Sequence, residues 1–451
     1  MIAALLVALG ILLPSRRPSG ADTSSLSPSL EKEVIDHETN QTQTTAVTST
    51  TVTPVTSSST TPPFSNGRFA SVLDLLISSN TSSPEDFAVP YSPQAEALQW
   101  VVEEDPLALD PLIEEEGERL IQRYVLMLLH YALGGSSWKN KSGYETGEDE
   151  RGSDAGTGWF GVVCDDEGSV TDLHLENNYL VGSSLPPEIS SLHRLESLNM
   201  GSNSIRGTLP RKLADLANLQ ILYLFDNNFV GSIPDMPPLL RVLNLGSNDI
   251  TGEIPSQLGN LDNLGMLDLS RNSLITTIPE SLMSLTNLRS LKISQFLSKG
   301  AYVQGTIPTA IGNLQTLETL DIDSGKLVGT LPDQITRLHK LVNLDLGHNL
   351  LASTIPSSIG DLQNLETCFL DGNHFNGTIP EGMGKLQKLY KLYLHENDLI
   401  GSMPQSVCNL NLGRLSSDCN NLTLPREVEC ACCSDCCEDV VKKRVPLGLL
   451  C

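Results

Sequence analysis

The segment Leu344-Asp345-Leu346-Gly347-His348-Asn349-Leu350-Leu351, followed by Pro356, contains the pattern that decides the fold of this chain. Side chains alternate along a strand, so Leu-x-Leu predicts a short strand with both leucines inward and the residue between them outward. The pattern recurs at steps of 21 to 29 residues, and its first position is occupied by Leu173, Leu198, Leu222, Leu243, Leu267, Leu291, Leu320, Leu344, Cys368 and Leu392. We therefore expect about ten similar units, each burying its apolar side against its neighbours.

A period in the twenties, with leucine and asparagine at fixed phases, is the signature of a leucine-rich repeat solenoid. We predict an α/β repeat fold over residues 170–407, a right-handed solenoid with a parallel concave sheet. A buried amide must be paired, so the inward asparagines should bond backbone groups in the bend of each unit. These asparagines are Asn178, Asn203, Asn227, Asn248, Asn272, Asn349, Asn373 and Asn397.

One step is longer than the others and adds residues around 295–302. Beside it, the asparagine position is occupied by Phe296 and, in the next unit, by Gly325. Insertions in single repeats often form binding loops, although neutral variation of a loop explains the pattern equally well.

The N-terminal third consists of three different kinds of segment. Residues 1–21 have a short apolar run followed by small residues, which predicts a cleaved signal peptide or, alternatively, a clipped membrane anchor. Residues 22–67 form a predicted disordered stalk, because 15 of the 25 residues in 39–63 are Ser or Thr. Residues 68–169 show helical spacing of apolar residues at 69–77, 95–102 and 120–133, which predicts a helical cap.

Charge restricts the partners of the chain. The formal net charge is −25, which argues against binding to nucleic acid or to an anionic membrane surface. Residues 85–118 contain eleven carboxylates and no basic residue. A solvated acidic face is the simpler interpretation, and a cation site is the alternative.

Two motifs of the cap region resemble a known family. Gly135-Ser136-Ser137-Trp138 and Trp159-Phe160-Gly161-Val162-Val163-Cys164, placed before Gly-x-Ile-Pro repeats, resemble the N-terminal cap and repeats of plant-type leucine-rich repeat proteins. Ala95–Trp100, Gln122–Tyr124 and Trp159–Val162 are similar to surface leucine-rich repeat proteins of diatoms, and this likeness extends over residues 90–439. The resemblance implies a receptor-like or inhibitor-like role without a kinase domain.

One residue departs from the family pattern. The family's cap usually has a cysteine two residues before the second tryptophan, paired with the cysteine that follows Gly-Val-x. Here that position is Thr157, so Cys164 is expected to be free or to pair with a distant residue.

Residues 408–439 form a predicted Cys-rich C-terminal cap, followed by a tail over residues 440–451. An extracellular chain of such cysteine density predicts disulfides that cover the last repeat, whereas zinc binding by the thiolates is the rival hypothesis. The disulfide candidates, whose connectivity stays open, are Cys408, Cys419, Cys430, Cys432, Cys433, Cys436, Cys437 and Cys451. Cys368 takes an inward leucine position and should be a buried free thiol.

The secretory route is also indicated by five sequons for N-glycosylation. They are at Asn40, Asn80, Asn140, Asn376 and Asn421. We therefore expect a secreted or cell-surface protein, or alternatively a membrane-anchored one with extracellular repeats.

Function should reside on the outward side chains of the concave strands, where solenoids bind partners. Carboxylates and aromatic rings gather there and suit a basic peptide or a sugar. The alternative is that the polar residues only keep the strand face soluble and that the aromatic rings are there because they fit strands well. The predicted ligand-binding residues are Tyr223, Phe225, Asp268, Lys292, Asp321, Asp323, Asp345, Phe369, Asp371 and Tyr393.

The leading hypothesis is a recognition module for an extracellular protein, peptide or glycan, in contact with a membrane only through an N-terminal anchor or a co-receptor. The alternative is a structural or adhesive wall or surface glycoprotein without a discrete small ligand. No catalytic constellation or phosphate-binding loop occurs in the sequence, so we expect no enzymatic activity and no cofactor or metal.

Overall fold

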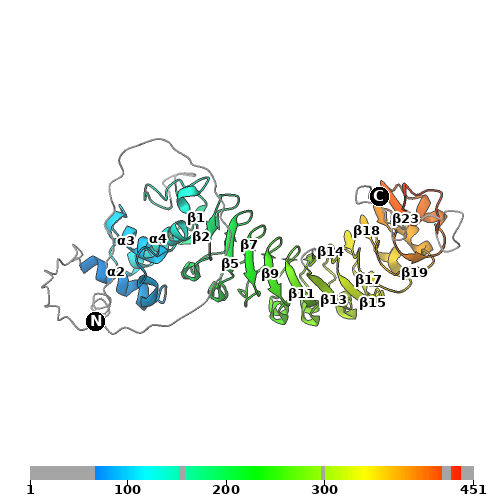
Figure 1. Cartoon of the computed structure of the whole chain (residues 1–451), viewed down its shortest axis with the longest axis horizontal. Coiled ribbons are helices and arrows are strands. Elements are labelled where there is room, and N and C mark those ends of the chain that lie inside the picture. Colours follow the sequence, from blue (N-terminus) through cyan, green and yellow to red (C-terminus); the bar gives the residue numbers. More distant parts are fainter. Residues whose placement is uncertain (1–66, 152–157, 296–299, 419–427, 438–451) are drawn as a thin grey trace, which may run out of the picture.

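The computed structural model describes residues 67–151, 158–295, 300–418 and 428–437. They form a long, curved solenoid with a helical cap at its N-terminal end (Figure 1). The predicted signal segment, nearly all of the stalk and the C-terminal tail lie outside these residues. Within them, no helix is both long and apolar enough to cross a membrane.

One sheet of 13 strands runs the length of the solenoid. β1 (Val162–Cys164) is antiparallel to β2 (Val170–His174), and every later strand is parallel to its neighbours. The ten leucine positions of the sequence pattern fall in β2 and in nine further strands, namely β4 Ser197–Asn199, β6 Ile221–Tyr223, β8 Val242–Asn244, β10 Met266–Asp268, β12 Ser290–Lys292, β14 Thr319–Asp321, β16 Asn343–Asp345, β18 Thr367–Phe369 and β20 Lys391–Tyr393. The predicted parallel sheet is therefore confirmed.

A second series of short strands lies after the bend of each unit, and the sequence analysis did not predict it. Segments at the same phase of successive repeats pair with one another because the same backbone groups recur in each repeat. Eight of these strands form one sheet: β3 Val181–Gly182, β5 Ser204–Thr208, β7 Asn228–Gly231, β9 Asp249–Gly252, β11 Ser273–Thr277, β13 Tyr302–Gly305, β15 Lys326–Gly329 and β17 Leu350–Leu351. Two further pairs are β19 Asn376–Gly377 with β21 Asp398–Leu399, and β22 Gly401–Ser402 with β24 Val428–Glu429.

Short helical turns follow the repeat prolines, because proline fits the start of a helix. They are η4 Pro187–Ser191, η5 Arg211–Asp215, η6 Ser256–Asn260, η7 Glu280–Ser284, η9 Thr309–Asn313, η10 Asp333–Arg337, η11 Ser357–Asp361, η12 Glu381–Lys385 and α5 Gln405–Cys408. The 21-residue unit with Pro234–Pro238 is fully described and has no such turn. The short step therefore removes the turn and leaves both strands in place.

The predicted hydrogen bonds between inward asparagines and the backbone are confirmed, and we call this row of side chains the asparagine ladder. The contacts of Asn349 are an example. Its amide nitrogen donates to the carbonyls of Ile322, Leu346 and Gly347 at 2.7, 3.1 and 3.1 Å. Its oxygen accepts from the Leu327 amide at 3.1 Å. Each side chain thus satisfies backbone groups of two adjacent repeats, which would cost about 1–3 kcal/mol if left buried and unpaired.

The row of side-chain amides continues at the longer step, where the sequence has Phe296 at the asparagine position. Phe296 lies outside the described residues, and buried Gln295 takes the asparagine role one position earlier. Its amide donates to the carbonyls of Leu269 and Ile293 at 3.1 and 3.0 Å and accepts from the Asn272 amide at 3.0 Å. The longer glutamine side chain compensates for the shifted position.

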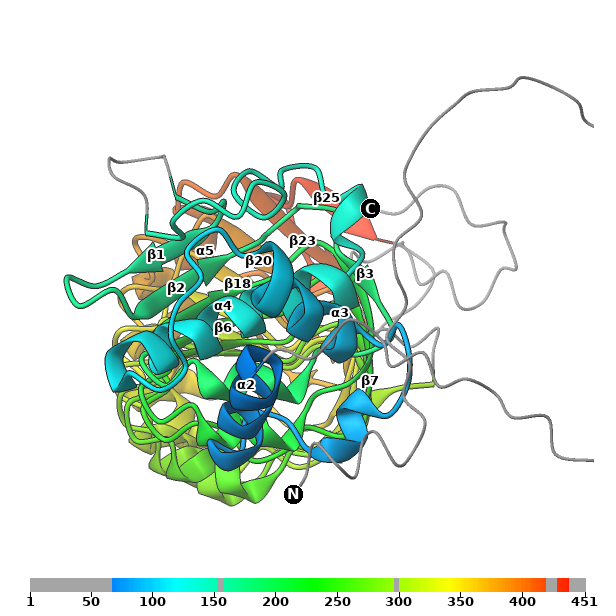
Figure 2. The same ribbon diagram turned by 90° about the vertical axis from the view of Figure 1, so that its left-hand side faces the viewer.

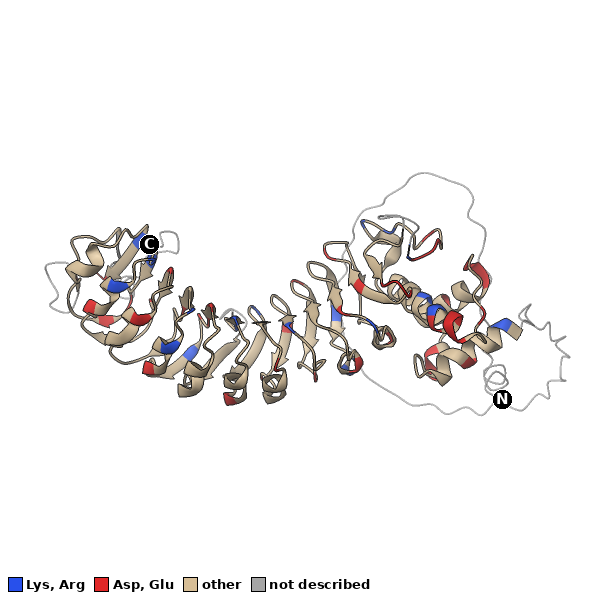
Figure 3. Ribbon diagram, turned by 180° about the vertical axis from the view of Figure 1, so that it is seen from behind, with Lys and Arg blue, Asp and Glu red and all other residues tan. Residues whose placement is uncertain are grey.

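The N-terminal cap contains the three predicted helical segments, packed over the first repeat (Figure 2). The cap elements are α2 Gly67–Ser78, η1 Pro84–Phe87, α3 Pro93–Gln99, η2 Trp100–Glu104, α4 Glu114–Ala132 and η3 Gly135–Ser137. Asp and Glu residues gather on the ribbon of this cap (Figure 3). The Gln122 side chain ties α4 to the first repeat, since its oxygen accepts from the Val170 amide at 2.6 Å.

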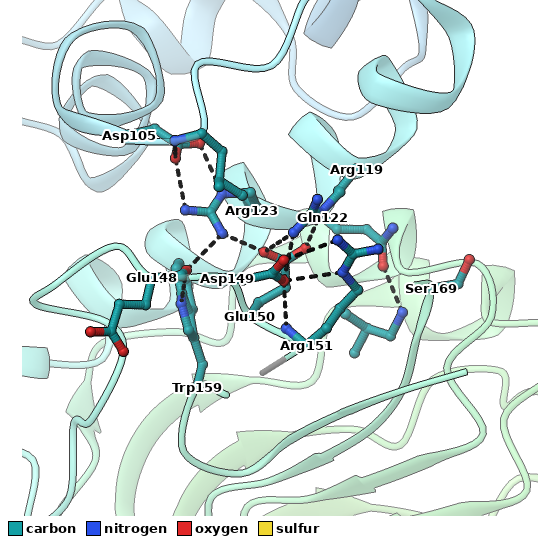
Figure 4. Close-up of polar contacts among 12 residues, drawn as sticks. Asp105, Arg119, Gln122, Arg123, Glu148, Asp149, Glu150, Arg151, Trp159 and Ser169 are labelled. Atoms are coloured by element: carbon teal, nitrogen blue, oxygen red, sulfur yellow. Dashed lines mark hydrogen bonds and ion pairs between the residues drawn. The ribbon is translucent and has the colours of Figure 1, made fainter. Parts of the chain in front are cut away.

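One carboxylate of the acidic run corrects the prediction of a solvated face (Figure 4). Asp105 is buried and accepts two hydrogen bonds from Arg123, at 2.8 and 2.7 Å. Arg123 is fully buried, also pairs with Glu150, and lies 5.3 and 5.0 Å from the ring centroids of Trp100 and Trp159. This ionic and aromatic cluster holds the loop that contains Glu150 against α4. Cys164, which follows this loop in the sequence, is a free thiol.

The C-terminal cap extends the main sheet, which the sequence did not predict. β23 (Arg414–Asp418) pairs with β20, and β25 (Asp435–Cys437) pairs with β23. Disulfides join Cys408 to Cys432 and Cys430 to Cys433, so these four sulfurs are not metal ligands. Cys419 and Cys451 lie outside the described residues, and Cys368 is buried and free as predicted.

Candidate functional site

The outward residues of neighbouring strands form one continuous row on the concave face. Strand pairing places Lys292 beside Asp321 and Asp321 beside Asp345. Asp268 precedes this trio and Phe369 follows it in the same register. Since neighbouring strands are about 4.8 Å apart, one lysine and three carboxylates occupy adjacent positions in this row.

A groove of about 460 Å³ opens over this row. We call it the concave groove. It contains six of the ten predicted ligand-binding residues. Its lining is Phe225, Asn244, Gly246, Ser247, Asp268, Ser270, Arg271, Lys292, Ser294, Gln295, Asp321, Asp323, Ser324 and Asp345.

The carboxylates of the groove are held by local hydrogen bonds. Asp321 accepts from the Ser294 hydroxyl, which in turn accepts from the Asp323 amide at 3.0 Å. Asp345 accepts from the Gly347 amide at 3.1 Å. These partners fix the directions of the side chains but bring no positive charge.

Burial changes the acidity of two of these groups. It raises the pKa of Asp345 to about 7, with a further upward contribution from the negative charges of Asp323, Asp321 and Asp371. Burial also raises the pKa of Asp321, although its Ser294 hydrogen bond acts in the opposite direction. The groove therefore holds carboxylates that a ligand cation would stabilise in their charged form.

Aromatic rings flank the groove on both sides. Tyr223 contacts Phe225 edge to face, with their ring centroids 6.1 Å apart. On the C-terminal side, Phe369 stacks on Tyr393 at 4.6 Å. The structure thus separates the predicted set into a charged centre and two aromatic margins.

Asp371 corrects the prediction, because it is buried and is not an exposed binding residue. Its Oδ2 atom lies 3.5 Å from Nε2 of His348 and 3.8 Å from Nε2 of His395. A carboxylate enclosed in this way fixes two imidazoles and offers little surface to a ligand.

The sequence analysis did not include several lining residues in the site. Ser294 and Ser270 occupy the outward position after the second leucine, and this position alone could have predicted that they line the groove. Arg271 lies in the bend with φ of 56° and reaches the groove from outside the strand pattern. Only the path of the chain through the bend brings this second cation to the groove.

Glycosylation candidates stay predictions. Asn80 and Asn376 are exposed, and Asn140 is half-buried. Asn40 and Asn421 lie outside the described residues. In the part of the chain that the structure describes, no cluster of three or more His, Cys, Asp or Glu side chains could hold a metal ion.

Known proteins share the repeat pattern. The family model described as leucine rich repeat matches residues 168–229, 238–295 and 315–375. Receptor-like protein 39 of Arabidopsis thaliana is 31% identical over 177 residues, which are 39% of this chain and 17% of that protein. The matched segments are leucine-rich repeats, and they are similar to those of plant receptor-like proteins. The receptor-like kinase TMK4 of the same plant is 42% identical over 73 residues, covering 16% of this chain and 8% of that kinase.

Solved structures with plant-type leucine-rich repeats have the same architecture. The Arabidopsis receptor kinase HAESA, in complex with the peptide hormone IDA and the co-receptor SERK1, has 33% identity and a TM-score of 0.56. That match covers 64% of this chain and 47% of the HAESA chain, so this chain spans about half the length of that chain. A plant ice-binding protein, at 23% identity and a TM-score of 0.52, shares the fold over 62% of this chain and 87% of its own.

Proposed function

We propose that this chain is a receptor-like extracellular recognition module that binds a peptide, with a basic side chain of the peptide seated in the concave groove. Asp321 and Asp345 are the main acceptors for that side chain, and Asp268 and Asp323 flank them. The aromatic pairs at the margins contact apolar residues of the same ligand. The proposal includes an extracellular location for this chain, as its resemblance to diatom surface proteins implies.

The observation that carries the proposal is the imbalance of charge in the groove. Four carboxylates line it against two cations, Lys292 and Arg271. A half-buried carboxylate whose pKa is raised to about 7 is stabilised by any cation that enters. HAESA, similar to this chain, is a receptor in complex with a peptide hormone, which makes a peptide the favoured class. A glycan would contact the rings but would leave the carboxylates without a counter-charge.

The test is a screen of peptides that contain one fixed arginine against immobilised full-length protein. Each peptide that binds is then synthesised with citrulline at that position, which preserves its shape and removes its charge. Charge-assisted hydrogen bonds contribute about 1.5–3 kcal/mol each, so the citrulline peptides should bind at least about tenfold more weakly. The double variant Asp321→Asn with Asp345→Asn should lose affinity to a similar extent.

Asp262→Asn is the matched control, because Asp262 is exposed and lies outside the groove. Affinity for the arginine peptides should also rise between pH 6 and pH 8, as Asp345 loses its proton. Equal binding of arginine and citrulline peptides would overturn the basic-peptide assignment. Saturable retention on wall material alone, with no peptide bound, would favour the structural or adhesive alternative.

A further inference from the structure

The concave groove contains more negative than positive charge, and the same chain has a basic run of matching size. Four carboxylates line the groove against two cations, an excess of two (four minus two). The basic run is Lys442-Lys443-Arg444, in the predicted tail and outside the described residues. It is the only place in the sequence where three basic residues are consecutive. Hydrogen bonds between such cations and carboxylates are among the stronger polar contacts in proteins.

The tail also has apolar residues in the order that the concave face has aromatic rings. Two valines immediately precede the basic run, and residues 445–450 follow it with the sequence Val-Pro-Leu-Gly-Leu-Leu. The charged centre of the groove likewise lies between two aromatic pairs. They are Phe369 with Tyr393 on the C-terminal side and Tyr223 with Phe225 on the N-terminal side. A segment that enters from the C-terminal end of the solenoid therefore meets rings, then carboxylates, then rings, in the order of its own side chains.

The last described strand lies in the same sheet as the groove. β25 pairs with β23, and β23 with β20, in a register that aligns Asp435 with Tyr393. The strands then continue through β18 to β16 and β14, and β23, β18 and β14 follow one another along the solenoid (Figure 1). Four strand steps lead from β25 to β16 and five lead to β14. At about 4.8 Å for each step, these distances are roughly 19 and 24 Å.

The length of chain between β25 and the basic run matches these distances. β25 ends at Cys437, and the basic run extends from the fifth to the seventh residue after it. An extended chain of five to seven residues spans about 17–25 Å. The basic run can therefore reach Asp345 in β16 and Asp321 in β14 with the described fold unchanged.

The covalent connection favours this tail over the tail of a second copy. A segment joined to its site by a short linker has an effective concentration in the millimolar range. A second copy at micromolar concentration competes poorly with such a segment. Contact within one chain is therefore the arrangement that the linker length favours.

We propose that the tail of this chain occupies the concave groove in cis, with its basic run against Asp345 and Asp321, and that a peptide ligand must displace it. This inference rests on the function proposed for the groove, because it makes the tail an internal competitor at the same site. The tail then lowers the apparent affinity for each external peptide by the same factor, set by the fraction of molecules with an open groove.

The first test removes the charge of the tail and keeps its length. In the neutral-tail variant of full-length protein, Lys442, Lys443 and Arg444 are all replaced by glutamine. The probe is a fluorescent synthetic peptide of residues 440–450, whose binding is followed by anisotropy. It should bind the neutral-tail variant at least about fivefold more tightly than the original protein, in which the tethered tail competes. This variant is also the background in which Asp345→Asn reports the effect of that carboxylate on stability, because no tail charge offsets it.

Two further variants show whether the competition depends on the groove. Asp321→Asn with Asp345→Asn, added to the neutral-tail variant, should weaken binding of the probe at least about tenfold, since two charge-assisted contacts are lost. The matched control replaces one arginine and two lysines elsewhere with glutamine. These residues are exposed and do not line the groove: Arg337, Lys340 and Lys385. The control protein should bind the probe as weakly as the original protein does.

Cross-linking distinguishes a tail bound in cis from the tail of a second copy. A carbodiimide joins a lysine amine to an adjacent carboxylate as an amide and takes up the released water as its urea. Full-length protein at micromolar concentration should give a cross-linked monomer in which mass spectrometry finds Lys442 or Lys443 joined to Asp321 or Asp345. Links that join the tail only to the groove of a second copy, and that increase with protein concentration, would overturn the arrangement in cis.

The outcomes separate this inference from the function on which it rests. Equal affinity of the original protein and the neutral-tail variant for the probe would overturn the tail contact, and so would a neutral-tail variant that does not bind the probe. Arginine peptides that bind these two proteins equally would also overturn the contact but leave the proposed function standing. Binding of the probe as expected, with no arginine peptide bound by either protein, would retain the contact and remove the proposed function.

Discussion

Among the described residues, a buried cluster of carboxylates in the cap and a half-buried cluster in the concave groove differ in how their charge is balanced. In the cap, Asp105 and Glu150 surround the fully buried guanidinium of Arg123 (Figure 4). In the concave groove, Asp321 and Asp345 receive hydrogen bonds from the Ser294 hydroxyl and from backbone amides, and the charge of Lys292 acts on Asp321. The first cluster pairs its buried carboxylates with arginines, whereas the groove has more carboxylates than cations.

The two arrangements differ in their expected effect on stability. Buried ions that satisfy each other fix the packing of the elements that carry them. Carboxylates that repel one another destabilise the fold, and a cation bound between them would relieve that cost. Similar residue types in two places therefore have opposite effects on stability, which can be measured.

The largest effect should come from Arg123→Met. Removal of the guanidinium leaves Asp105 buried without a counter-ion and leaves Glu150 paired with Arg119 alone, which costs about 3–5 kcal/mol. Chemical denaturation followed by tryptophan fluorescence should show early unfolding of the cap, because all three tryptophans are there. A decrease of less than about 1 kcal/mol in the free energy of unfolding would show that the cluster is solvated. The cap and the groove would then not differ in how their charges affect stability.

A smaller effect of opposite sign should follow Asp345→Asn. The pKa of Asp345 is raised to about 7 in the folded chain, above its unfolded value, so this group lowers the stability as pH rises from the unfolded pKa to about 7, and the loss is complete above that pH. The asparagine variant cannot ionise and should be more stable by about 1–2 kcal/mol at pH 8, with little difference at pH 4. Denaturation of both proteins at the two pH values measures this, and a variant that is less stable at pH 8 would contradict the assignment.

The smallest effect should come from Arg151→Met, which breaks an ion pair of the same residue types at the surface. Arg151 bonds Asp149 at 2.9 Å, and both side chains are more than a third exposed. Exposed pairs contribute about 0–1 kcal/mol, so denaturation should show little change. A loss as large as that of Arg123→Met would mean that burial does not explain the difference between the clusters.

The sequence predicted the repeats well because their information is local and periodic. The two inward leucines of a unit can be buried only against the leucines of neighbouring units. The side chain of Asn349 can be paired by backbone groups in the bend. The outward row could be named in advance for the same reason, since alternation along a strand fixes which side chains face outward. Six of the ten named residues line one groove.

The remaining features depend on contacts between distant residues. Nothing in the spacing of Asp371 showed that two histidines of adjacent repeats would enclose it, or that Gln295 would replace an asparagine one position away. The cap was predicted as helical, but its buried ion cluster joins residues 18 and 27 positions apart. Such partners meet only when the loop folds back on α4.

The sequence by itself determined the solenoid, its register and the side chains on its concave face, because a repeated pattern specifies each neighbour by the same rule. Only the tertiary structure decided which carboxylates are neutralised and which are not. Charge balance depends on burial and on the few ångströms between side chains, and those distances are set by the packing of segments far apart in the chain.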